Sequence, residues 1–167
     1  MLQTLYTQLM RALNRLGLAL CIILYFSRPS LAGPRADHWS GFDIGTMVPF
    51  PSLIGAIIGF NLQDDARLSF GGGHFDRYAN YQIFDAKLFF TPTALSGYIG
   101  GGLDFLVGKR GKVWIWDLNF DRAFVPYLQI GIDYQDPSGF HATLNVAGTA
   151  PNGEPIVMPG LAVGWYF

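Results

Sequence analysis

The sequence predicts an all-β fold: an eight-stranded antiparallel up-and-down transmembrane β-barrel preceded by a helical signal peptide. Half of the 167 residues are apolar and only 14% are charged, which is an unusually uncharged profile for a soluble domain. The sequence holds one apolar run of helical character, and that run is short. Elsewhere, segments of about ten residues alternate apolar with polar or small side chains, which is the period of a β-strand.

Residues 1–32 are predicted to be the signal peptide, and residues 33–167 the barrel. Two arginines precede the apolar run Leu16–Phe26, and Ser30-Leu31-Ala32 places small residues where a signal peptidase cleaves. A membrane anchor is the alternative, but about eleven apolar residues in a helix reach only about half of a 30 Å hydrocarbon layer. Met10 is a second candidate start, because beginning there shortens a long leader.

The mature chain is mildly acidic and has no cysteine. From Gly33 onward it carries eight Lys and Arg against twelve Asp and Glu. Its basic cluster, residues 109–112, is short and is interpreted as a solvated loop, so nucleic acid is not an expected partner. Cys21 lies within the apolar run of the leader, and the mature chain is therefore expected to form no disulfide.

Eight segments show the strand alternation. In the last of them Leu161, Val163 and Trp165 alternate with glycine and alanine, so one face is apolar and the other is mostly small. The third is the least regular, because the run Gly71–Gly73 predicts a bulge or a sharp bend. The predicted strands are residues 40–50, 53–63, 66–77, 81–91, 96–108, 123–135, 139–148 and 156–167.

The connections are predicted to alternate between short periplasmic turns and extracellular loops, two of which are long. The segment Val113–Phe120 also alternates and is an alternative ninth strand. A hairpin that extends the fifth and sixth strands is preferred, because nine strands would leave the two termini on opposite sides of the barrel wall. The periplasmic turns are 63–65, 91–95 and 136–139, and the extracellular connections are 49–52, 77–80, 108–122 and 148–155.

The composition of the two strand faces favours a barrel in lipid over a soluble β-sandwich. A sandwich core built from the glycine-rich face would be hollow, and one built from the apolar face would leave a surface of glycine and few charges. In hydrocarbon every backbone hydrogen bond must be made internally, and a sheet achieves this only by closing on itself. Aromatic residues expected in the interfacial girdles are Trp39, Phe42, Tyr81, Phe90, Tyr98, Trp114, Tyr127, Tyr134 and Trp165.

A set of polar residues is predicted to point into the barrel. The interior of an eight-stranded barrel is just filled by side chains, so a hydrogen-bonded charge network that fills the lumen is expected. A continuous path for water or small solutes is the alternative, because many interior positions are glycine. The predicted lumen network comprises Asp43, Asp85, Lys87, Asp104, Asp133 and His141, with Arg67 as a partner if its strand turns it inward.

An enzymatic hypothesis rests on His141, Thr143 and Glu154. A hydroxyl two residues from a histidine lies on the same strand face, and a carboxylate can orient the imidazole. This layout is similar to that of outer-membrane lipid A deacylases, which have serine where Thr143 stands. The alternation also turns His141 inward, away from a lipid substrate. The three histidines of the chain are too scattered for a metal site, and neither a metal nor another cofactor is expected.

The C-terminal segment Gly160–Phe167 resembles the closing strand of bacterial outer-membrane proteins. Residues 85–92 and 98–103 are similar to the hairpins of small barrels of the OmpX and OmpW type. The resemblance implies a place in the bacterial outer membrane, with lipid and lipopolysaccharide as partners. It also implies that the barrel-assembly machinery reads Leu161, Val163, Trp165 and Phe167.

Such barrels are functionally diverse, so the resemblance constrains the fold more than the activity. The expected function is that of a non-enzymatic barrel with a filled lumen. Its exposed loops, residues 109–122 and 148–155, would contact solutes, surfaces or lipopolysaccharide. A narrow channel for small solutes and a lipid A-modifying enzyme are the alternatives.

Overall fold

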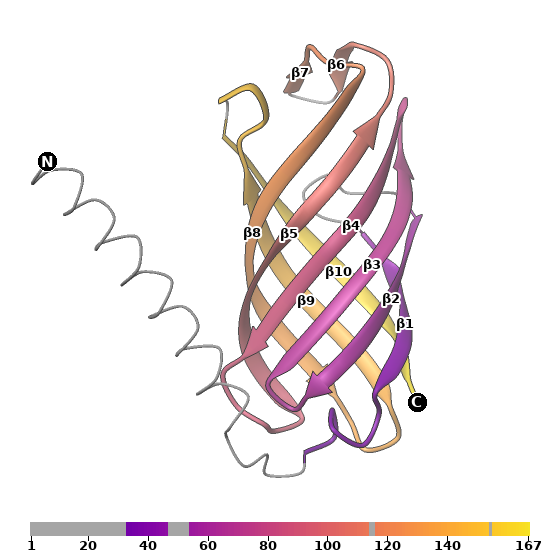
Figure 1. Ribbon diagram of the computed structural model, residues 1–167, viewed down its shortest axis with the longest axis vertical. Coiled ribbons are helices and arrows are strands. Elements are labelled where there is room, and N and C mark those ends of the chain that lie inside the picture. The colour runs from indigo at the N-terminus through magenta and orange to yellow at the C-terminus, as the bar shows by residue number, and fades with distance from the viewer. Residues whose placement is uncertain (1–32, 47–53, 114–115, 154) are drawn as a thin grey trace, which may run out of the picture. The chain divides into compact units, whose positions relative to one another are not determined.

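A computed structural model of the chain describes residues 33–46, 54–113, 116–153 and 155–167 (Figure 1). The predicted signal peptide, the predicted connection 49–52, Trp114 and Glu154 lie outside the described residues. None of the helices among the described residues is long and apolar enough to cross a membrane.

The described part of the chain contains ten strands and one short 3₁₀ helix. Eight strands close into an antiparallel barrel in the order β1-β10-β9-β8-β5-β4-β3-β2, which confirms the predicted fold class (Figure 1). The elements are β1 (Ser40–Gly45), β2 (Ile54–Gln63), β3 (Ala66–Phe75), β4 (Tyr78–Phe89), β5 (Leu95–Val107), β6 (Gly111–Val113), β7 (Trp116–Leu118), β8 (Arg122–Gln135), β9 (Phe140–Thr149), η1 (Pro151–Gly153) and β10 (Ile156–Tyr166).

The barrel closes where its first and last strands meet. β1 pairs with β10 from Gly41 opposite Tyr166 to Gly45 opposite Ala162. Past the end of this ladder, the backbone nitrogen of Phe167 donates to the carbonyl of Ser40 at 2.6 Å. The last residue of the chain therefore takes part in the seam that removes the two open edges of the sheet.

The segment between β5 and β8 forms a hairpin and not a ninth barrel strand. β6 and β7 pair only with each other, and this small sheet lies at the end of the barrel opposite the C-terminus (Figure 1). We name this end of the barrel the hairpin end and the opposite end the C-terminal end. The preference for a hairpin over an extra wall strand is confirmed.

The irregularity expected at the glycine run lies mainly on the neighbouring strand. Gly71–Gly73 pair with β2 without any shift, whereas β4 carries an extra residue at Ile83 and Phe84, both of which are exposed. The bulge therefore lies on β4, where the register with β3 shifts between Ser69 and Gly71, beside the glycine run and not within it. At Gly71 a Cβ would overlap the carbonyl of Ala56, so glycine there permits close approach of two strands.

The connection between β3 and β4 is tighter than predicted. It consists of Asp76 and Arg77, whereas residues 77–80 were expected to form it, and β4 begins at Tyr78. Asp76 adopts a φ of 50°, in the left-handed region that a two-residue hairpin turn requires and that aspartate tolerates. The alternation in the sequence does not show which residue takes that conformation, so the turn was placed too late.

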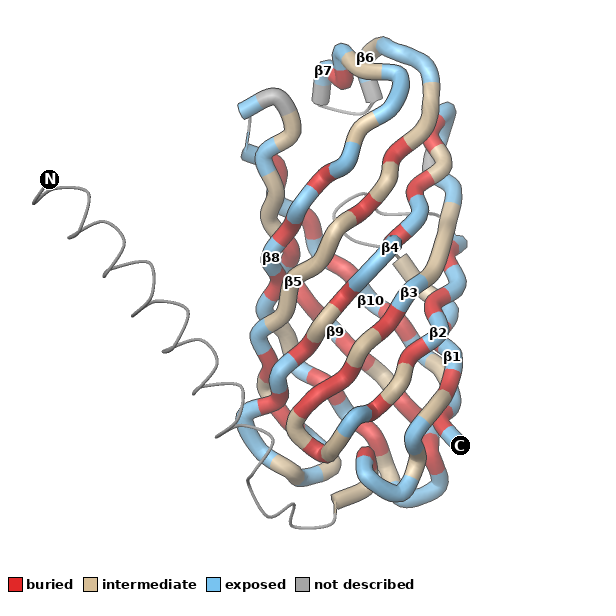
Figure 2. The backbone as a smooth tube through the Cα atoms, in the orientation of Figure 1, coloured by how far each residue is buried: buried red, intermediate tan, exposed pale blue. Residues whose placement is uncertain are grey.

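Burial alternates along the strands as the period of two requires (Figure 2). Leu128 is 72% exposed and Leu161 55%, whereas the polar residues Asp85 and His141 have no exposed surface. Large apolar side chains therefore face outward and polar ones face the lumen.

Two aromatic residues predicted for the girdles point the other way. Tyr98 is fully buried and Tyr127 is 4% exposed, so both project into the lumen. In the alternation of their strands both occupy inward-facing positions. The girdle prediction rested on their being aromatic and disregarded that alternation. The other described candidates are exposed: Trp39, Phe42, Tyr81, Phe90, Tyr134 and Trp165.

Candidate functional site

The lumen is occupied by three groups of side chains that succeed one another along the barrel. The basal network, at the C-terminal end, comprises Arg35, Asp43, Asn61, Arg67, Asp133, Gln135, His141 and Tyr166. The middle cluster comprises Ser69, Gln82, Asp85, Gln129 and Asn145. The apolar cap, at the hairpin end, comprises Tyr78, Leu106, Leu118, Val125, Ile156 and Met158.

Asp133 is the carboxylate at the centre of the basal network. Its Oδ1 accepts hydrogen bonds from Nη2 of Arg35 at 2.8 Å and from Nε at 3.1 Å, and its Oδ2 accepts one from Nη1 of Arg67 at 2.9 Å. All three side chains are at most 1% exposed. Buried charges are tolerated when they are paired and their hydrogen-bonding capacity is used, and both conditions hold here.

Arg67 extends the network to three further polar groups. Its Nε donates to Asn61 at 2.7 Å and its Nη2 donates to Gln135 at 2.7 Å, while Nη1 lies 2.6 Å from Nε2 of His141. The guanidinium also lies 4.3 Å from the ring centroid of Tyr166, within cation–π range. The planar guanidinium suits this role because its donors spread in a fixed fork.

His141 lies between two carboxylates. Its Nδ1 is 2.5 Å from Oδ1 of Asp43, and its Nε2 is 2.5 Å from Oδ2 of Asp133. The hydroxyl of Tyr166 donates to the other oxygen of Asp43 at 3.1 Å. Because the carboxylates bind opposite nitrogens of the ring, they hold the imidazole in place and do not converge on a common point.

Arg35 enters the lumen from the turn that precedes β1. The side chain is fully buried, its Nη1 donates to the carbonyl of Thr93 at 2.8 Å, and its guanidinium lies 4.2 Å from the ring centroid of Phe89. Burial lowers the pKa of this guanidinium, and the Asp133 carboxylate opposes that effect. Arg35 therefore joins the turn before β1 to the basal network.

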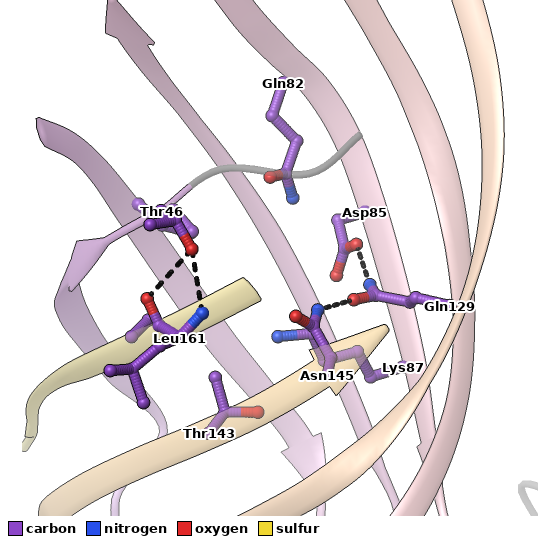
Figure 3. A pocket seen from close by; sticks show the side chains of 10 residues that line it. Thr46, Gln82, Asp85, Lys87, Gln129, Thr143, Asn145 and Leu161 are labelled. Atoms are coloured by element: carbon purple, nitrogen blue, oxygen red, sulfur yellow. Dashed lines mark hydrogen bonds between the residues drawn. The ribbon is translucent and has the colours of Figure 1, made fainter. Parts of the chain in front are cut away.

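The middle cluster is arranged around Asp85 (Figure 3). Its carboxylate accepts hydrogen bonds from the hydroxyl of Tyr127 at 2.6 Å, from the hydroxyl of Ser69 at 3.1 Å and from the side-chain amide of Gln129. Gln129 in turn accepts a hydrogen bond from Asn145 at 2.5 Å. These side chains come from four strands and join opposite walls of the barrel.

A small cavity lies beside the middle cluster, and Lys87 is among the residues that line it (Figure 3). Its volume is about 20 Å³, which is the space of about one water molecule. A cavity of this size is too small to be a solute-binding site. Beside it, the Lys87 ammonium lies 5.2 Å from the ring centroid of Tyr98.

Tyrosine rings occupy the space beside the interior glycines. A Cβ on Gly131 would come within 2.8 Å of the Tyr98 ring, and one on Gly102 would come within 2.9 Å of the Tyr127 hydroxyl. A Cβ on Gly59 would overlap the hydroxyl of Tyr166. At these three positions glycine therefore leaves room for an aromatic side chain, and at Gly102 and Gly131 also for the backbone of a neighbouring strand.

The apolar cap joins the hairpin to the barrel strands at the hairpin end. Leu118 of β7 is 2% exposed and contacts a cluster that includes Leu106, Val125 and Met158 from three barrel strands. The hydroxyl of Tyr78 donates to the carbonyls of Leu118 and Phe120, each at 3.3 Å. The hairpin is thus attached to the barrel by both apolar contacts and hydrogen bonds.

All seven residues predicted for the lumen network are buried, and they divide into separate groups. Asp43, Arg67, Asp133 and His141 lie in the basal network, whereas Asp85 and Lys87 lie in or beside the middle cluster. Asp104 belongs to neither group; Asn80 and Asp85 are among the polar groups near its carboxylate, and Gln82 is its cross-strand partner on β4. Sequence reasoning did not assign Arg35, Asn61, Gln129, Gln135 and Tyr166 to the network.

Strand parity could have found most of the missed residues. Asn61, Gln129 and Tyr166 follow the same alternation as the aspartates, but only charged side chains were selected. Arg35 precedes the first strand, so no period predicts its position.

The residues of the enzymatic hypothesis do not form a nucleophile and base pair. The hydroxyl of Thr143 donates to the carbonyl of Ile132 at 3.2 Å and to the hydroxyl of Tyr98 at 3.4 Å. Both ring nitrogens of His141 contact carboxylates. No group of His, Cys, Asp or Glu among the described residues is arranged to hold a metal ion.

The residues predicted as the assembly signal lie on the outer face of β10 and just beyond it. Leu161, Val163, Trp165 and Phe167 are 40–65% exposed. Trp165 contacts Phe140 edge-on with ring centroids 5.9 Å apart, and Phe167 lies 6.4 Å from Phe42. An aromatic belt therefore surrounds the barrel seam at the C-terminal end.

Comparison with known proteins identifies a related architecture. No protein-family model matches the sequence, and no curated protein matches it. The barrel is similar to the N-terminal β-barrel domain of Pseudomonas aeruginosa OprF. The TM-score is 0.61 at 22% sequence identity, covering 78% of this chain and 98% of that domain. At this identity the likeness establishes the fold.

Two further solved structures match more distantly. The Yersinia pestis outer membrane protein Ail, in a phospholipid bilayer nanodisc, matches with a TM-score of 0.48 and 11% identity over 78% of this chain and 99% of that chain. The Escherichia coli outer membrane protein W matches with a TM-score of 0.47 and 12% identity over 78% of this chain and 98% of that chain.

Proposed function

We propose that the chain is a non-enzymatic outer-membrane protein of Gram-negative bacteria whose barrel is closed to solutes and which acts through the surface at its hairpin end. The observation that carries the proposal is the succession of side-chain groups through the lumen, polar at one end and apolar at the other. A barrel filled in this way supports display of a surface and does not support transport.

The outer face supports a location in lipid. Leu128, Ile130 and Leu161 are each more than half exposed, and apolar side chains of this kind surround the barrel. A soluble monomer rarely exposes a contiguous apolar patch larger than a few hundred Å². A closed sheet satisfies its backbone in hydrocarbon, and the predicted leader would deliver it to the outer membrane.

The hairpin end is the basic end of the barrel, and this supports lipopolysaccharide as its partner. Of the eight Lys and Arg from Gly33 onward, all of which are described, three are buried in the lumen. The other five are exposed at the hairpin end: Arg77, Lys109, Arg110, Lys112 and Arg122. Of these, Arg77 and Arg110 form exposed ion pairs with Asp76 and Asp121. Exposed cations gathered at one rim suit the phosphate groups of an anionic lipid.

The arrangement of His141 supports a structural and not a catalytic role. In an acyl-transfer site the imidazole must reach the nucleophile, with one carboxylate orienting it. Here two carboxylates bind the imidazole, and Thr143 donates elsewhere. A lipid substrate would also have to cross the wall to reach them.

Location and closure can be tested separately. An integral barrel should stay in membranes washed with urea and should migrate as a compact species that shifts on boiling. In planar bilayers the wild-type protein should give no steady single-channel steps, while a general porin in the same bilayers serves as the positive control. Steady steps that change with Asp104→Ala would establish the channel alternative instead.

The lipid partner can be tested with two sets of variants. Replacing Lys109, Arg110 and Lys112 by alanine should weaken binding to lipid A vesicles, measured as the fraction that co-sediments. The matched variant Lys109→Arg/Lys112→Arg retains the charge and should bind like the wild type. Equal binding of all three proteins to lipid A, or equal binding to lipid A without phosphates, would contradict the proposal.

A further inference from the structure

A buried carboxylate accepts three backbone hydrogen bonds from the turn that precedes β1. Asp64, in the turn between β2 and β3, is 2% exposed. Its Oδ2 accepts a hydrogen bond from the backbone nitrogen of Gly33 at 2.6 Å, and its Oδ1 accepts bonds from the nitrogens of Arg35 at 3.1 Å and Ala36 at 2.9 Å. Among the described residues, no Lys, Arg or His side chain lies close enough to form an ion pair with it.

Gly33 fits this position closely. A Cβ there would overlap the carbonyl of Pro92 and would come within 2.7 Å of Oδ1 of Asp64. The nitrogen of Gly33 is therefore confined next to a carboxylate that has a buried negative charge and three backbone donors. The Arg35 guanidinium attracts this carboxylate from beyond ion-pair distance, so a positive charge at the Gly33 nitrogen, 2.6 Å away, would be its first direct ionic partner among the described residues.

We propose that Asp64 is the binding site for the N-terminal ammonium group that signal peptide cleavage creates at Gly33. The leader is predicted to end at Ala32, so a signal peptidase would hydrolyse the Ala32–Gly33 bond. Water adds across the C–N bond, its oxygen remains on the new carboxylate of Ala32, and the nitrogen of Gly33 leaves as an amine. This amine takes up a proton at neutral pH, because α-amino groups have a pKa of about 8.

The ion pair has a consequence for the lumen, because the same turn carries Arg35. Two residues after the new terminus, the Arg35 side chain reaches Asp133 and the carbonyl of Thr93. Before cleavage Gly33 offers one neutral N–H to Asp64, and after cleavage it offers a charged group. Cleavage therefore anchors the turn that joins Arg35 to the basal network.

The first experiment identifies the terminus and isolates its charge. The full precursor is expressed, the protein is purified from membranes, and its intact mass is expected to place Gly33 first. A second precursor carries one serine inserted between Ala32 and Gly33, so that the processed protein has an amide at Gly33. In denaturant titrations the equilibrium constant for unfolding should rise about tenfold in the insertion variant.

The second part tests whether Asp64 is the partner. Asp64→Asn should raise the unfolding constant in the wild-type background and should have a much smaller effect in the insertion background. Asp37→Asn, an exposed carboxylate in the same turn, is the matched control and should change neither protein. An equal effect of Asp64→Asn in both backgrounds would overturn the proposal, as would a mature chain that begins elsewhere.

A measurement on the wild-type protein covers the case in which Asp64→Asn does not fold. An amine-selective acylating reagent is applied at neutral pH, and modification of the N-terminal peptide is followed by mass spectrometry. The Gly33 amine should react about ten times more slowly in the folded protein than in the boiled protein. The serine terminus of the insertion variant should show little protection. Equal reactivity of the two folded proteins would refute the ion pair.

Discussion

Replacing Arg67 with methionine is expected to lower the free energy of unfolding by about 3–5 kcal/mol. Methionine retains an unbranched side chain of similar length, so the change removes the charge and the donors more than the volume. Arg67 is 1% exposed, and the basal network depends on it at several points.

The expected loss in free energy of unfolding follows from the buried polar groups that lose a hydrogen-bond donor in Arg67→Met. Asp133 loses a donor at 2.9 Å and retains Arg35, while Asn61 and Gln135 each lose a donor at 2.7 Å. A hydrogen bond to a buried charge contributes about 1.5–3 kcal/mol, and a neutral one about 1 kcal/mol. Loss of the cation–π contact with Tyr166 adds to these terms.

The assay is reversible unfolding by guanidinium in lipid vesicles, followed by tryptophan fluorescence. Trp39 and Trp165 lie on the outer face, so their emission reports the loss of lipid contact. A double-mutant cycle with Asp133→Leu should give a coupling energy of about 1–3 kcal/mol, because the two side chains are in direct contact.

Arg77→Met is the matched control. Arg77 also forms an ion pair, with Asp76 at 3.3 Å, but both side chains are roughly half exposed. An exposed pair contributes about 0–1 kcal/mol, so this variant should unfold nearly like the wild type. If Arg67→Met and Arg77→Met have equal effects, the basal network does not stabilise the barrel and the reasoning is refuted.

Three further predictions concern the wall of the barrel. Leu161→Arg, on the outer face of β10, should cost about 2–4 kcal/mol in vesicles, while Leu161→Phe should be tolerated; equal unfolding midpoints would place that face away from lipid. Deletion of Phe167 should lower the amount of heat-modifiable barrel in outer membranes without changing the amount exported, because its backbone contributes to the seam; unchanged assembly would argue against that role. Gly59→Ala should cost about 1–3 kcal/mol by overlapping the Tyr166 hydroxyl, and Tyr166→Phe in the same protein should recover part of the loss; no recovery would show that the hydroxyl is not the obstacle.

The alternation of side chains was sufficient to predict the eight strands and the direction of the charged residues. Both follow from a local property, since successive side chains of a strand point to opposite faces. Alternation alone also allowed a ninth strand at Val113–Phe120, and β6 and β7 were set apart by a different argument, that an even number of strands returns the chain to its starting side. The predictions for Tyr98 and Tyr127 were wrong because they followed residue type, whereas the alternation places both side chains inward.

Local rules were less successful where a contact depends on the neighbouring strand. The extra residue in β4 exists because of its pairing with both β3 and β5, and nothing in the sequence of β4 alone marks Ile83. The sequence likewise does not show that tyrosines from other strands occupy the space beside Gly59, Gly102 and Gly131. A count of small residues does not show which large residue faces them.

The sequence by itself determined which side chains point inward along each regular stretch of strand, because there the direction depends only on the period of two. The tertiary structure decided which of them meet: it separated Asp85 from Asp133, left Asp104 beside Asn80, and brought Arg35 into the lumen from outside every strand. The physical reason is that partners in a closed barrel are set by register and stagger between strands distant in sequence, and these arise from the closure of the whole sheet.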